Sequence, residues 1–374
     1  MIVIIAPEDD FHAIVTRHVL REEFSSDCEI LELGAFPRSA QLSLAIDAQR
    51  EHIRYRSEAR RIDWSAVQAV WWRRPQLTFT TAQDMADDAA ASEFAVRECS
   101  SIVMTLFSDG PARVVNRPHR QQRAACKGTQ LVHAMRLSIP VPATLITNDR
   151  DEVDAFRQTH PACVFKVLTW FGERLIPTQR LTDEDLLHAD ALDRAPIIVQ
   201  EQLPPGMDIR VNIFGTELFA AAKQVDSVDG RLDLALWEDH VLPDCLGRQL
   251  LELMHVLGLD YGCSDLRLLP DGRYIFLEVN PSGQFLMVER DTQQPLTRSL
   301  CRLLSADGAA ATGRARAGRE CGRPWWSWSQ IRWHSKTAAS RMAAFAPPRN
   351  SAAIPSSSRL ALQAHRPSRC APYS

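Results

Sequence analysis

The stretch that decides the fold runs from Asp265-Leu266-Arg267 through the turn Pro270-Asp271-Gly272 to Tyr274-Ile275-Phe276-Leu277-Glu278-Val279-Asn280-Pro281. An Asp-Gly turn between two strand-like runs predicts a β-hairpin. Because side chains alternate along a strand, Glu278 and Asn280 share one face, and Asp265 on the partner strand can meet them. Two carboxylates and an amide oxygen suit Mg²⁺ that holds nucleotide phosphates. The alternative is a hairpin with an ordinary polar face.

Lysine usage indicates a second part of such a site. Only four of the 43 Lys and Arg residues are lysines, namely Lys127, Lys166, Lys223 and Lys336. Lys127 opens a predicted helix, and Lys166 lies in an apolar strand. A compact ammonium acts as a point charge on a phosphate, which suits both for a nucleotide site. The alternative is two surface lysines retained by chance in an arginine-rich sequence.

Length and composition bound the class of protein. The 374 residues suit two or three domains, and 45% hydrophobic with 24% charged residues is ordinary for a soluble enzyme. A net charge of -3 gives no support for nucleic-acid binding. We expect no membrane span, because no apolar run reaches about 18 residues. Nine scattered cysteines without a C-x-x-C pair, and a start that lacks a basic signal region, predict reduced thiols and a cytoplasmic protein.

The C-terminal segment differs from the rest of the chain. From Ser305 onward eleven Lys or Arg face two acids, a balance of +9, which leaves about -12 for the preceding body. The segment is rich in Ala, Ser, Pro and Arg and has no sustained periodicity. Such a composition predicts a tail without a core of its own, either disordered or translated in a shifted reading frame. An Arg/Trp anchor for membrane or nucleic acid is a lesser alternative.

Residues 1–115 alternate strand-like and helix-like pieces, which predicts a small α/β domain with a mainly parallel sheet. Arg73 and Arg74 follow the strand-like run 67–72. They would therefore lie at the carboxyl end of a strand, where ligands bind in open α/β sheets. The alternative for this pair is an exposed, salt-bridged position.

Beyond residue 116 the pattern becomes α+β. A helix begins at Lys127, strands follow at 143–147, 162–168 and 197–203, and the loop 169–174 could fold over phosphates. In the alternating run 208–214, Asp208, Arg210 and Asn212 share one face.

The order of these parts resembles that of the ATP-grasp ligases over roughly residues 113–290. Within that superfamily the chain is most similar to the maturases of ribosomal peptides (microviridin-type, or graspetide, ligases), with ribosomal-protein glutamate ligases as relatives. The resemblance is carried by Lys127, Lys166, Gln200-Glu201-Gln202-Leu203, Asp208-Ile209-Arg210, Asp265 and Glu278-Val279-Asn280-Pro281, together with Trp71-Trp72-Arg73-Arg74-Pro75, Val115-Asn116-Arg117-Pro118, Val141-Pro142-Ala143-Thr144-Leu145-Ile146-Thr147-Asn148 and Asn280-Pro281-Ser282-Gly283-Gln284-Phe285.

This resemblance implies an ATP-grasp fold of class α/β (α+β). A pre-ATP-grasp α/β domain would occupy residues 1–115. A central subdomain (116–195) and a C-terminal subdomain with the metal site (196–305) would clasp ATP. Residues 306–374 match nothing in the family.

The resemblance also implies roles for individual residues. Lys127 and Lys166 would contact ATP phosphates. Gln200, Glu201, Gln202 and Leu203 would form the hinge against adenine, and Asp208 would reach the ribose. Asp265, Glu278 and Asn280 would hold two Mg²⁺, with Mn²⁺ as an alternative ion. Arg210 would be the catalytic residue that stabilises charge on the transferred phosphoryl group and the acyl phosphate.

The implied activity is an ATP-dependent ligase. It would phosphorylate Asp or Glu side chains of a ribosomal precursor peptide, with leader and core, and join them to Ser/Thr hydroxyls or Lys amines. The implied partner is that peptide, with neither nucleic acid nor membrane, and a homodimer is an open alternative. A glutamate-adding or other amino-acid ligase is the second hypothesis, and a non-catalytic peptide-binding module is the third.

One region departs from the family pattern. Many relatives carry an Asp-aromatic-Arg element before the last helix, whereas this chain has Arg231-Leu232-Asp233-Leu234-Ala235-Leu236-Trp237, with no arginine after the acid. Lys223 either takes over that charge or is a plain strand lysine.

Overall fold

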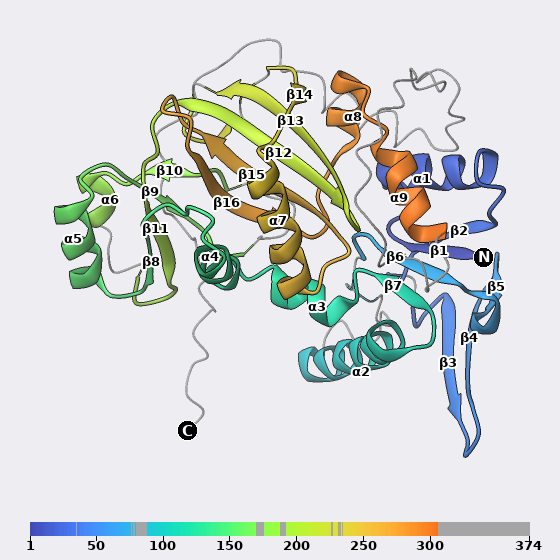
Figure 1. Cartoon of the computed structure of the whole chain (residues 1–374). Coiled ribbons are helices and arrows are strands. Elements are labelled where there is room, and N and C mark those ends of the chain that lie inside the picture. The colour runs from blue at the N-terminus through green and yellow to red at the C-terminus, as the bar shows by residue number, and fades with distance from the viewer. Residues whose placement is uncertain are drawn as a thin grey trace, which may run out of the picture. The chain divides into compact units, whose positions relative to one another are not determined.

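The computed structural model describes residues 1–34, 36–75, 77, 79, 88–169, 176–187, 192–225, 227–230, 233 and 235–305. This part of the chain forms two compact units, shown in Figure 1. One unit holds residues 1–142 and the described residues from Pro204 onward, and the other holds residues 143–203. The predicted tail (306–374) and most of the predicted phosphate loop (170–174) lie outside the described residues.

The larger unit begins with a parallel sheet in the order β2-β1-β6-β7. Its strands are β1 (Ile2–Ile5), β2 (Cys28–Leu31), β6 (Ala69–Trp72) and β7 (Arg113–Val115). Every residue of β1 and β6 is buried, which explains their unbroken apolar runs. Helices α1 (Phe11–Glu22) and α2 (Ala89–Asp109) start at Asp10 and Asp88, whose side chains accept backbone N–H groups.

An antiparallel meander, absent from the sequence-based prediction, lies between β2 and β6 along the chain. It consists of β3 (Ala40–Ile46), β4 (Glu51–Ser57) and β5 (Arg61–Asp63), followed by the short helix η1 (Trp64–Ala66). Only a few of its side chains are buried, so its apolar pattern is short and easily overlooked in sequence. The N-terminal domain is therefore more than the predicted parallel sheet.

The second sheet of this unit is antiparallel, in the order β14-β13-β12-β15-β16. One face is apolar and packs against α4 (Lys127–Arg136) and α7 (Asp244–Leu257). Helix α3 (Pro118–Ala124) leads into α4. Gly258 ends α7 with a positive φ of 72°, a conformation that glycine adopts without strain. The strands are β12 (Gly206–Phe214), β13 (Glu217–Val225), β14 (Glu238–His240), β15 (Tyr261–Leu268) and β16 (Tyr274–Asn280).

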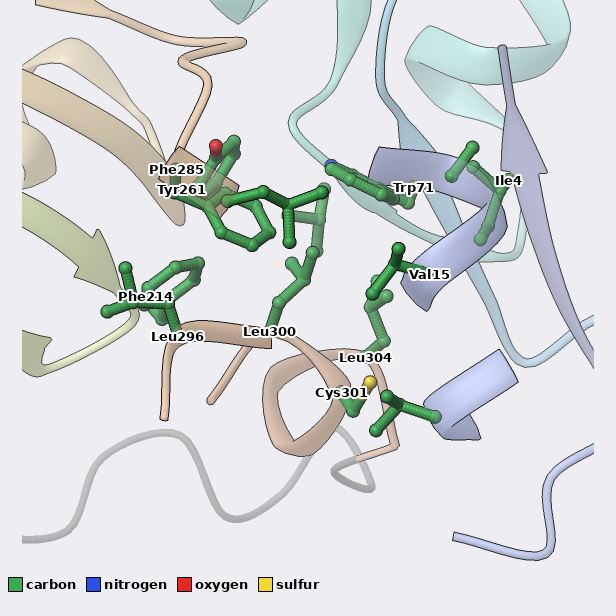
Figure 2. Close-up of a cluster of buried hydrophobic side chains, with 14 of the residues drawn as sticks. Ile4, Val15, Trp71, Phe214, Tyr261, Phe285, Leu296, Leu300, Cys301 and Leu304 are labelled. Atoms are coloured by element: carbon green, nitrogen blue, oxygen red, sulfur yellow. The ribbon is translucent and has the colours of Figure 1, made fainter. Parts of the chain in front are cut away.

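The parallel sheet and the five-stranded antiparallel sheet both contribute to one apolar cluster (Figure 2). Trp71 of β6 meets Tyr261 of β15 edge to face, with ring centroids 6.2 Å apart, and Phe285 packs on Tyr261. Helices α8 (Leu286–Thr292) and α9 (Leu296–Ser305) follow, and α9 lies beside α1 in Figure 1. The described C-terminal residues therefore complete the core of the N-terminal domain.

The smaller unit is built on a sheet in the order β10-β9-β11-β8. Val153, Cys163, Leu192 and Val199 form its buried core. Its elements are β8 (Thr144–Thr147), α5 (Arg150–Thr159), β9 (Cys163–Lys166), β10 (Gln179–Arg180), α6 (Asp183–Leu187) and β11 (Ile197–Glu201).

Two general features of the described residues are the character of their helices and the state of their cysteines. Within the described ranges, no helix is both long and apolar enough to cross a membrane. The described cysteines are free thiols: Cys28, Cys99, Cys126, Cys163, Cys245, Cys263 and Cys301.

Candidate active site

The hairpin predicted from sequence is formed by β15 and β16, with Gly272 at a φ of 85° in the turn. Asp265 lies directly opposite Glu278, and Cys263 lies opposite Asn280. The register shifts after Asp265, so that Leu266 pairs with Phe276 and Leu277 is an extra residue in β16. Asp265, Glu278 and Asn280 therefore share one face, as predicted, although the bulge was not.

Charged side chains cross this face in two rows because the strands pair in register. In one row, Asp208 of β12 lies between Lys223 of β13 and Arg267 of β15. In the next row, Asp265 lies between Arg210 of β12 and Glu278 of β16. The predicted catalytic arginine and two of the predicted metal ligands are therefore neighbours on three adjacent strands.

Arg210 and Asp265 form a two-pronged ion pair. The Nε of Arg210 lies 2.8 Å from one oxygen of Asp265, and Nη2 lies 3.0 Å from the other. Nη1 also donates to the carbonyl oxygen of Gln284 at 3.3 Å. Burial alone would lower the pKa of Arg210, but the Asp265 carboxylate outweighs it and raises that pKa. The guanidinium is thus permanently charged and fixed in orientation.

Lys127 is the first residue of α4 and reaches the same carboxylate face, with Nζ 3.6 Å from Glu278 Oε2. Buried Gln130, one turn later, holds α4 against β16. Its amide donates to the carbonyl oxygen of Val279 at 2.7 Å and accepts the Val279 N–H at 2.8 Å. The sequence offered no signal for Gln130 beyond its place in the helix.

The donor set fits Mg²⁺. No cluster of three or more His, Cys, Asp or Glu residues suited to a metal occurs among the described residues. Asp265 and Glu278 supply two carboxylates with side chains 22% and 36% exposed, and Asn280 supplies an amide oxygen that accepts the Ser282 N–H at 3.1 Å. Mg²⁺ commonly takes one or two carboxylates and completes its shell with water and substrate phosphates. These three residues match that chemistry.

The neighbouring row, formed by Lys223, Asp208 and Arg267, contacts the loop that follows β13. Asp208 pairs with Arg267 at 2.7 Å; burial raises the pKa of Asp208, and the Arg267 charge opposes this. Lys223 Nζ donates to the carbonyl oxygens of Gly230 (2.6 Å) and Asp233 (3.2 Å). Burial lowers the pKa of Lys223. These contacts tie Lys223 to the loop after β13, and the choice between the two roles expected for this lysine stays open.

The smaller unit brings together the other predicted nucleotide residues. Lys166 Nζ donates to Gln200 Oε1 at 2.7 Å, and the Gln200 amide donates to the Thr144 hydroxyl at 2.8 Å. Glu201, the last residue of β11, accepts the Ala143 N–H at 2.9 Å through its side chain. Gln202 and Leu203, which are also predicted to belong to the adenine hinge, follow directly. Lys127 and the predicted metal ligands belong to the other unit, so a nucleotide site that joins both sets stays a prediction.

Arg73 was considered either a ligand-facing or an exposed residue, and the structure corrects both views. Its side chain is fully buried, with Nη1 donating to the carbonyl oxygens of Ser282 and Gly283, the latter at 3.0 Å. The loop after β16 covers the carboxyl end of β6, which removes this arginine from solvent. Arg74 is exposed.

Two further polar residues were not assigned functions from the sequence. The amide of buried Asn116 donates to the carbonyl oxygens of Tyr261 (2.8 Å) and Pro281 (3.0 Å). The Nε2 of His12 accepts the N–H groups of Phe285 (3.0 Å) and Leu286 (3.3 Å). Burial lowers the pKa of His12 well below its usual value, as does the charge of Arg73, so His12 accepts hydrogen bonds as the neutral imidazole.

Comparison with known proteins agrees with this architecture. Residues 1–120 match the family model of the MvdD pre-ATP-grasp domain. No curated protein sequence matches the chain. Solved structures match most of its length.

Two of these structures come from Microcystis aeruginosa MRC. The macrocyclase MdnC, bound with the precursor peptide MdnA, is 27% identical, with a TM-score of 0.74 over 81% of this chain and 98% of MdnC. The macrocyclase MdnB is 26% identical, with a TM-score of 0.68 over 81% and 98%.

A third structure is the ATP-grasp ligase PsnB, complexed with a minimal precursor. It is 25% identical, with a TM-score of 0.68 over 81% of this chain and 97% of PsnB. PsnB has also been solved with its minimal precursor, Mg and ADP.

These matches confirm the resemblance inferred from the residues. The chain has the ATP-grasp ligase fold, with a pre-ATP-grasp domain at its N-terminus, and it is similar to ATP-grasp ligases that act with ribosomal precursor peptides.

Proposed function

We propose that the protein is an ATP-dependent ligase that matures a ribosomal precursor peptide. It activates Asp or Glu side chains of that peptide as acyl phosphates and joins them to Ser/Thr hydroxyls or Lys amines, releasing ADP and phosphate. The similarity to MdnC and PsnB, which are described with precursor peptides, supports this choice of substrate over a free amino acid.

The observation that carries the proposal is the row Arg210–Asp265–Glu278 with Lys127 beside it. Two carboxylates for a cation stand next to an arginine and a lysine for phosphate oxygens. Phosphoryl transfer requires positioning and charge neutralisation more than covalent chemistry from the protein. This row supplies both in a fold whose relatives are ligases.

In the first step, a carboxylate oxygen of the peptide attacks the γ-phosphorus of ATP, and the bond to the β-phosphate oxygen breaks to release ADP. Asp265, Glu278 and Asn280 would hold Mg²⁺, which neutralises charge on the phosphates. Lys127 contributes an ammonium to phosphate oxygens, and Arg210 stabilises negative charge on the transferred phosphoryl group. The ion pair with Asp265 keeps Arg210 in a fixed orientation before substrate arrives.

In the second step, a hydroxyl or amine of the same peptide attacks the acyl carbon. The carbon–oxygen bond to phosphate breaks, inorganic phosphate leaves, and the attacking group loses its proton, giving an ester or an amide. Each bond removes one water from the mass of the peptide.

The remaining roles are part of the same proposal. Lys166 contacts ATP phosphates, residues 200–203 form the adenine hinge, and Asp208 reaches the ribose. The hydrogen bonds of Lys166 with Gln200 and of Glu201 with Ala143 support a preorganised hinge in the smaller unit. The proposed domains are those expected from sequence, with residues 116–195 and 196–305 clasping the nucleotide.

The test incubates the purified protein with ATP, Mg²⁺ and synthetic peptides carrying a leader and a core with Asp/Glu and Ser/Thr/Lys, followed by mass spectrometry. We expect loss of one water mass per bond with the wild-type protein and none with Glu278→Gln. Arg302→Met, which alters an exposed ion pair with Glu217, serves as the matched control and should behave as wild type.

Other outcomes would replace the proposal. A peptide that gains mass only when free glutamate is supplied indicates the glutamate-adding ligase. Failure of the wild-type protein to bind Mg·ADP in calorimetry indicates a non-catalytic binding module.

A further inference from the structure

The loop that follows β16, Pro281–Phe285, is held by arginines from two sides; we call it the post-β16 loop. Buried Arg73, at the end of β6, donates to the carbonyl oxygens of Ser282 and Gly283. Arg210, on β12, donates to the next carbonyl oxygen, that of Gln284, at 3.3 Å. Three successive carbonyls thus accept from two guanidinium groups on different sheets.

The N–H groups at the end of this loop are satisfied by the N-terminal domain as well. His12, in the first turn of α1, accepts from Phe285 and from Leu286, the first residue of α8. Unpaired buried N–H groups are costly, so the neutral imidazole fixes where the loop ends and the helix begins. The Phe285 ring also packs edge to face on His12, with centroids 4.9 Å apart.

The loop has no spare room beneath it. The Tyr261 hydroxyl donates to the Gly283 carbonyl oxygen at 2.5 Å, and a Cβ at Gly283 would overlap the side chain of Cys263. Tyr261 and Phe285 belong to the cluster that joins the two sheets (Figure 2). The backbone of the loop is therefore confined by packing against Tyr261 and Cys263, and by Arg73 and His12 of the N-terminal domain.

The loop is directly connected to the row formed by Arg210, Asp265 and Glu278. Asn280, a predicted metal ligand, precedes it, and the Asn280 amide oxygen accepts the Ser282 N–H. The guanidinium of Arg210 contacts the loop and Asp265 together. A displacement of the loop would therefore move an amide ligand and the phosphoryl-binding arginine at the same time.

Arg73 is buried with only part of its hydrogen-bonding capacity used, although its guanidinium lies 5.6 Å from the centroid of the Trp71 ring. Its side chain has zero exposure, its Nε lies 3.5 Å from Asp10, and its Nε and Nη2 make no hydrogen bond with the described residues. A buried charge with incomplete pairing is usually less stable than an apolar residue of similar size. A role in stability alone does not account for an arginine at this position.

We infer that His12 and Arg73 are positioning residues: through the post-β16 loop, the N-terminal domain sets the geometry of Asn280 and Arg210 for Mg²⁺-dependent phosphoryl transfer. This inference rests on the proposed function. It assigns to the pre-ATP-grasp domain an effect on cation binding that the post-β16 loop transmits, beyond any contact with peptide.

The principal test replaces Arg73 by Met, which keeps most of the volume and removes the donors. We expect the Mg²⁺ concentration for half-maximal ATP turnover to rise about tenfold or more, as when a residue supporting a metal ligand is lost. The KM for ATP at saturating Mg²⁺ should change little, and the thermal midpoint should stay or rise. Arg73→Lys restores a donor for the two carbonyls. It should lower the Mg²⁺ concentration for half-maximal turnover part of the way back to the wild-type value.

The second test replaces His12 by Leu, with His12→Gln as the conservative variant because its amide oxygen can accept the same N–H groups. Hydrogen exchange of the Phe285 and Leu286 amides should accelerate about tenfold in His12→Leu and much less in His12→Gln. The binding of Mg·ADP, followed by calorimetry, should weaken in the same order. His18→Leu, on the same helix, is the matched control and should change neither.

The outcomes separate this inference from the proposed function. A wild-type protein that binds no Mg·ADP refutes the proposed function, regardless of the hydrogen-exchange rates of the Phe285 and Leu286 amides. A wild-type protein that turns over ATP, with Arg73→Met showing the same Mg²⁺ dependence, refutes the positioning role alone. Lower thermal stability with unchanged Mg²⁺ dependence would show that Arg73 only supports packing, and would also refute it.

Discussion

The parallel sheet and the five-stranded antiparallel sheet of the larger unit use their residues in opposite ways. The strands β1 and β6 of the parallel sheet are buried on both faces and carry polar side chains only beyond their ends, such as Arg73. The antiparallel sheet packs one face on α7. On its other face, Phe214 and Tyr261 join the core shared with the parallel sheet, and paired charges such as Arg210 and Asp265 lie beside them. The first sheet is thus a structural support, and the second also carries the residues of the proposed active site.

This difference shows how the fold separates stability from reactivity. Residues of the parallel sheet contribute mainly apolar burial, at about 25 cal/mol per Å² of apolar surface. The charged rows contribute oriented ions, whose benefit for folding is small or negative. Mutations in the parallel sheet should therefore lower mainly the free energy of unfolding, and mutations of the charged rows should lower mainly the ATP turnover.

The largest effect on turnover is expected on the sheet face that carries Asp265, Glu278 and Asn280. Glu278→Gln removes a carboxylate charge from the proposed Mg²⁺ site, and the ATP-dependent turnover should fall at least about 1,000-fold, because a bound metal supplies several kcal/mol of transition-state stabilisation. The thermal midpoint should change by a few degrees at most, since Glu278 is partly exposed. Phosphate release and a melting curve measure both; unchanged turnover would remove the catalytic role from this face.

A core truncation in the supporting sheet should give the reverse result. Ile4 of β1 has no exposed surface, and Ile4→Ala should lower the free energy of unfolding by about 3 kcal/mol through lost burial and a cavity. The ATP turnover per folded molecule should stay within about twofold at low temperature. Denaturant titration and a turnover assay on the same sample test this. A collapse of turnover in folded protein would mean that the two sheets are not separable.

A pH effect should arise at the contact between α8 and α9. Burial raises the pKa of Glu289, on α8, from its ordinary 4.5 to about 7, against hydrogen bonds from Thr297 that lower it. The folded protein thus holds this proton more tightly than the unfolded chain. The resulting stability is complete below pH 4.5 and is lost as the pH rises through 7.

Glu289→Gln should remove that part of the pH dependence. We expect the difference in unfolding free energy between pH 4.5 and pH 8 to shrink by about 1–3 kcal/mol in the variant. Denaturant titrations across this pH range provide the measurement. An identical pH profile in both proteins would show that Glu289 is ionised in the folded state at an ordinary pKa.

The smallest effect is expected at the surface. Arg302 of α9 pairs with Glu217 at 3.0 Å, with side chains 48% and 36% exposed. Arg302→Met should change the unfolding free energy by no more than about 0.5 kcal/mol, because solvent screens such pairs. A larger loss, measured by denaturant titration, would mean that α9 depends on this contact to cover the N-terminal domain.

Local patterns were sufficient to predict the elements that carry the site. The Asp-Gly turn predicted the hairpin, and strand alternation predicted that Asp208, Arg210 and Asn212 share a face. The meander β3–β5 was missed because its buried positions are few, and the bulge at Leu277 because alternation assumes a regular ladder. The roles assigned to the site residues stay predictions.

The sequence by itself determined the β-hairpin, the oxygen donors Asp265, Glu278 and Asn280, and the likeness to ATP-grasp ligases, because turns and alternation depend on neighbours in the chain. Only the tertiary structure placed His12 on the amide of Phe285, 273 residues away, and Arg73 on Gly283. Such contacts have no local signature, since burial and hydrogen-bond partners at that separation are decided only when the two sheets close on one core.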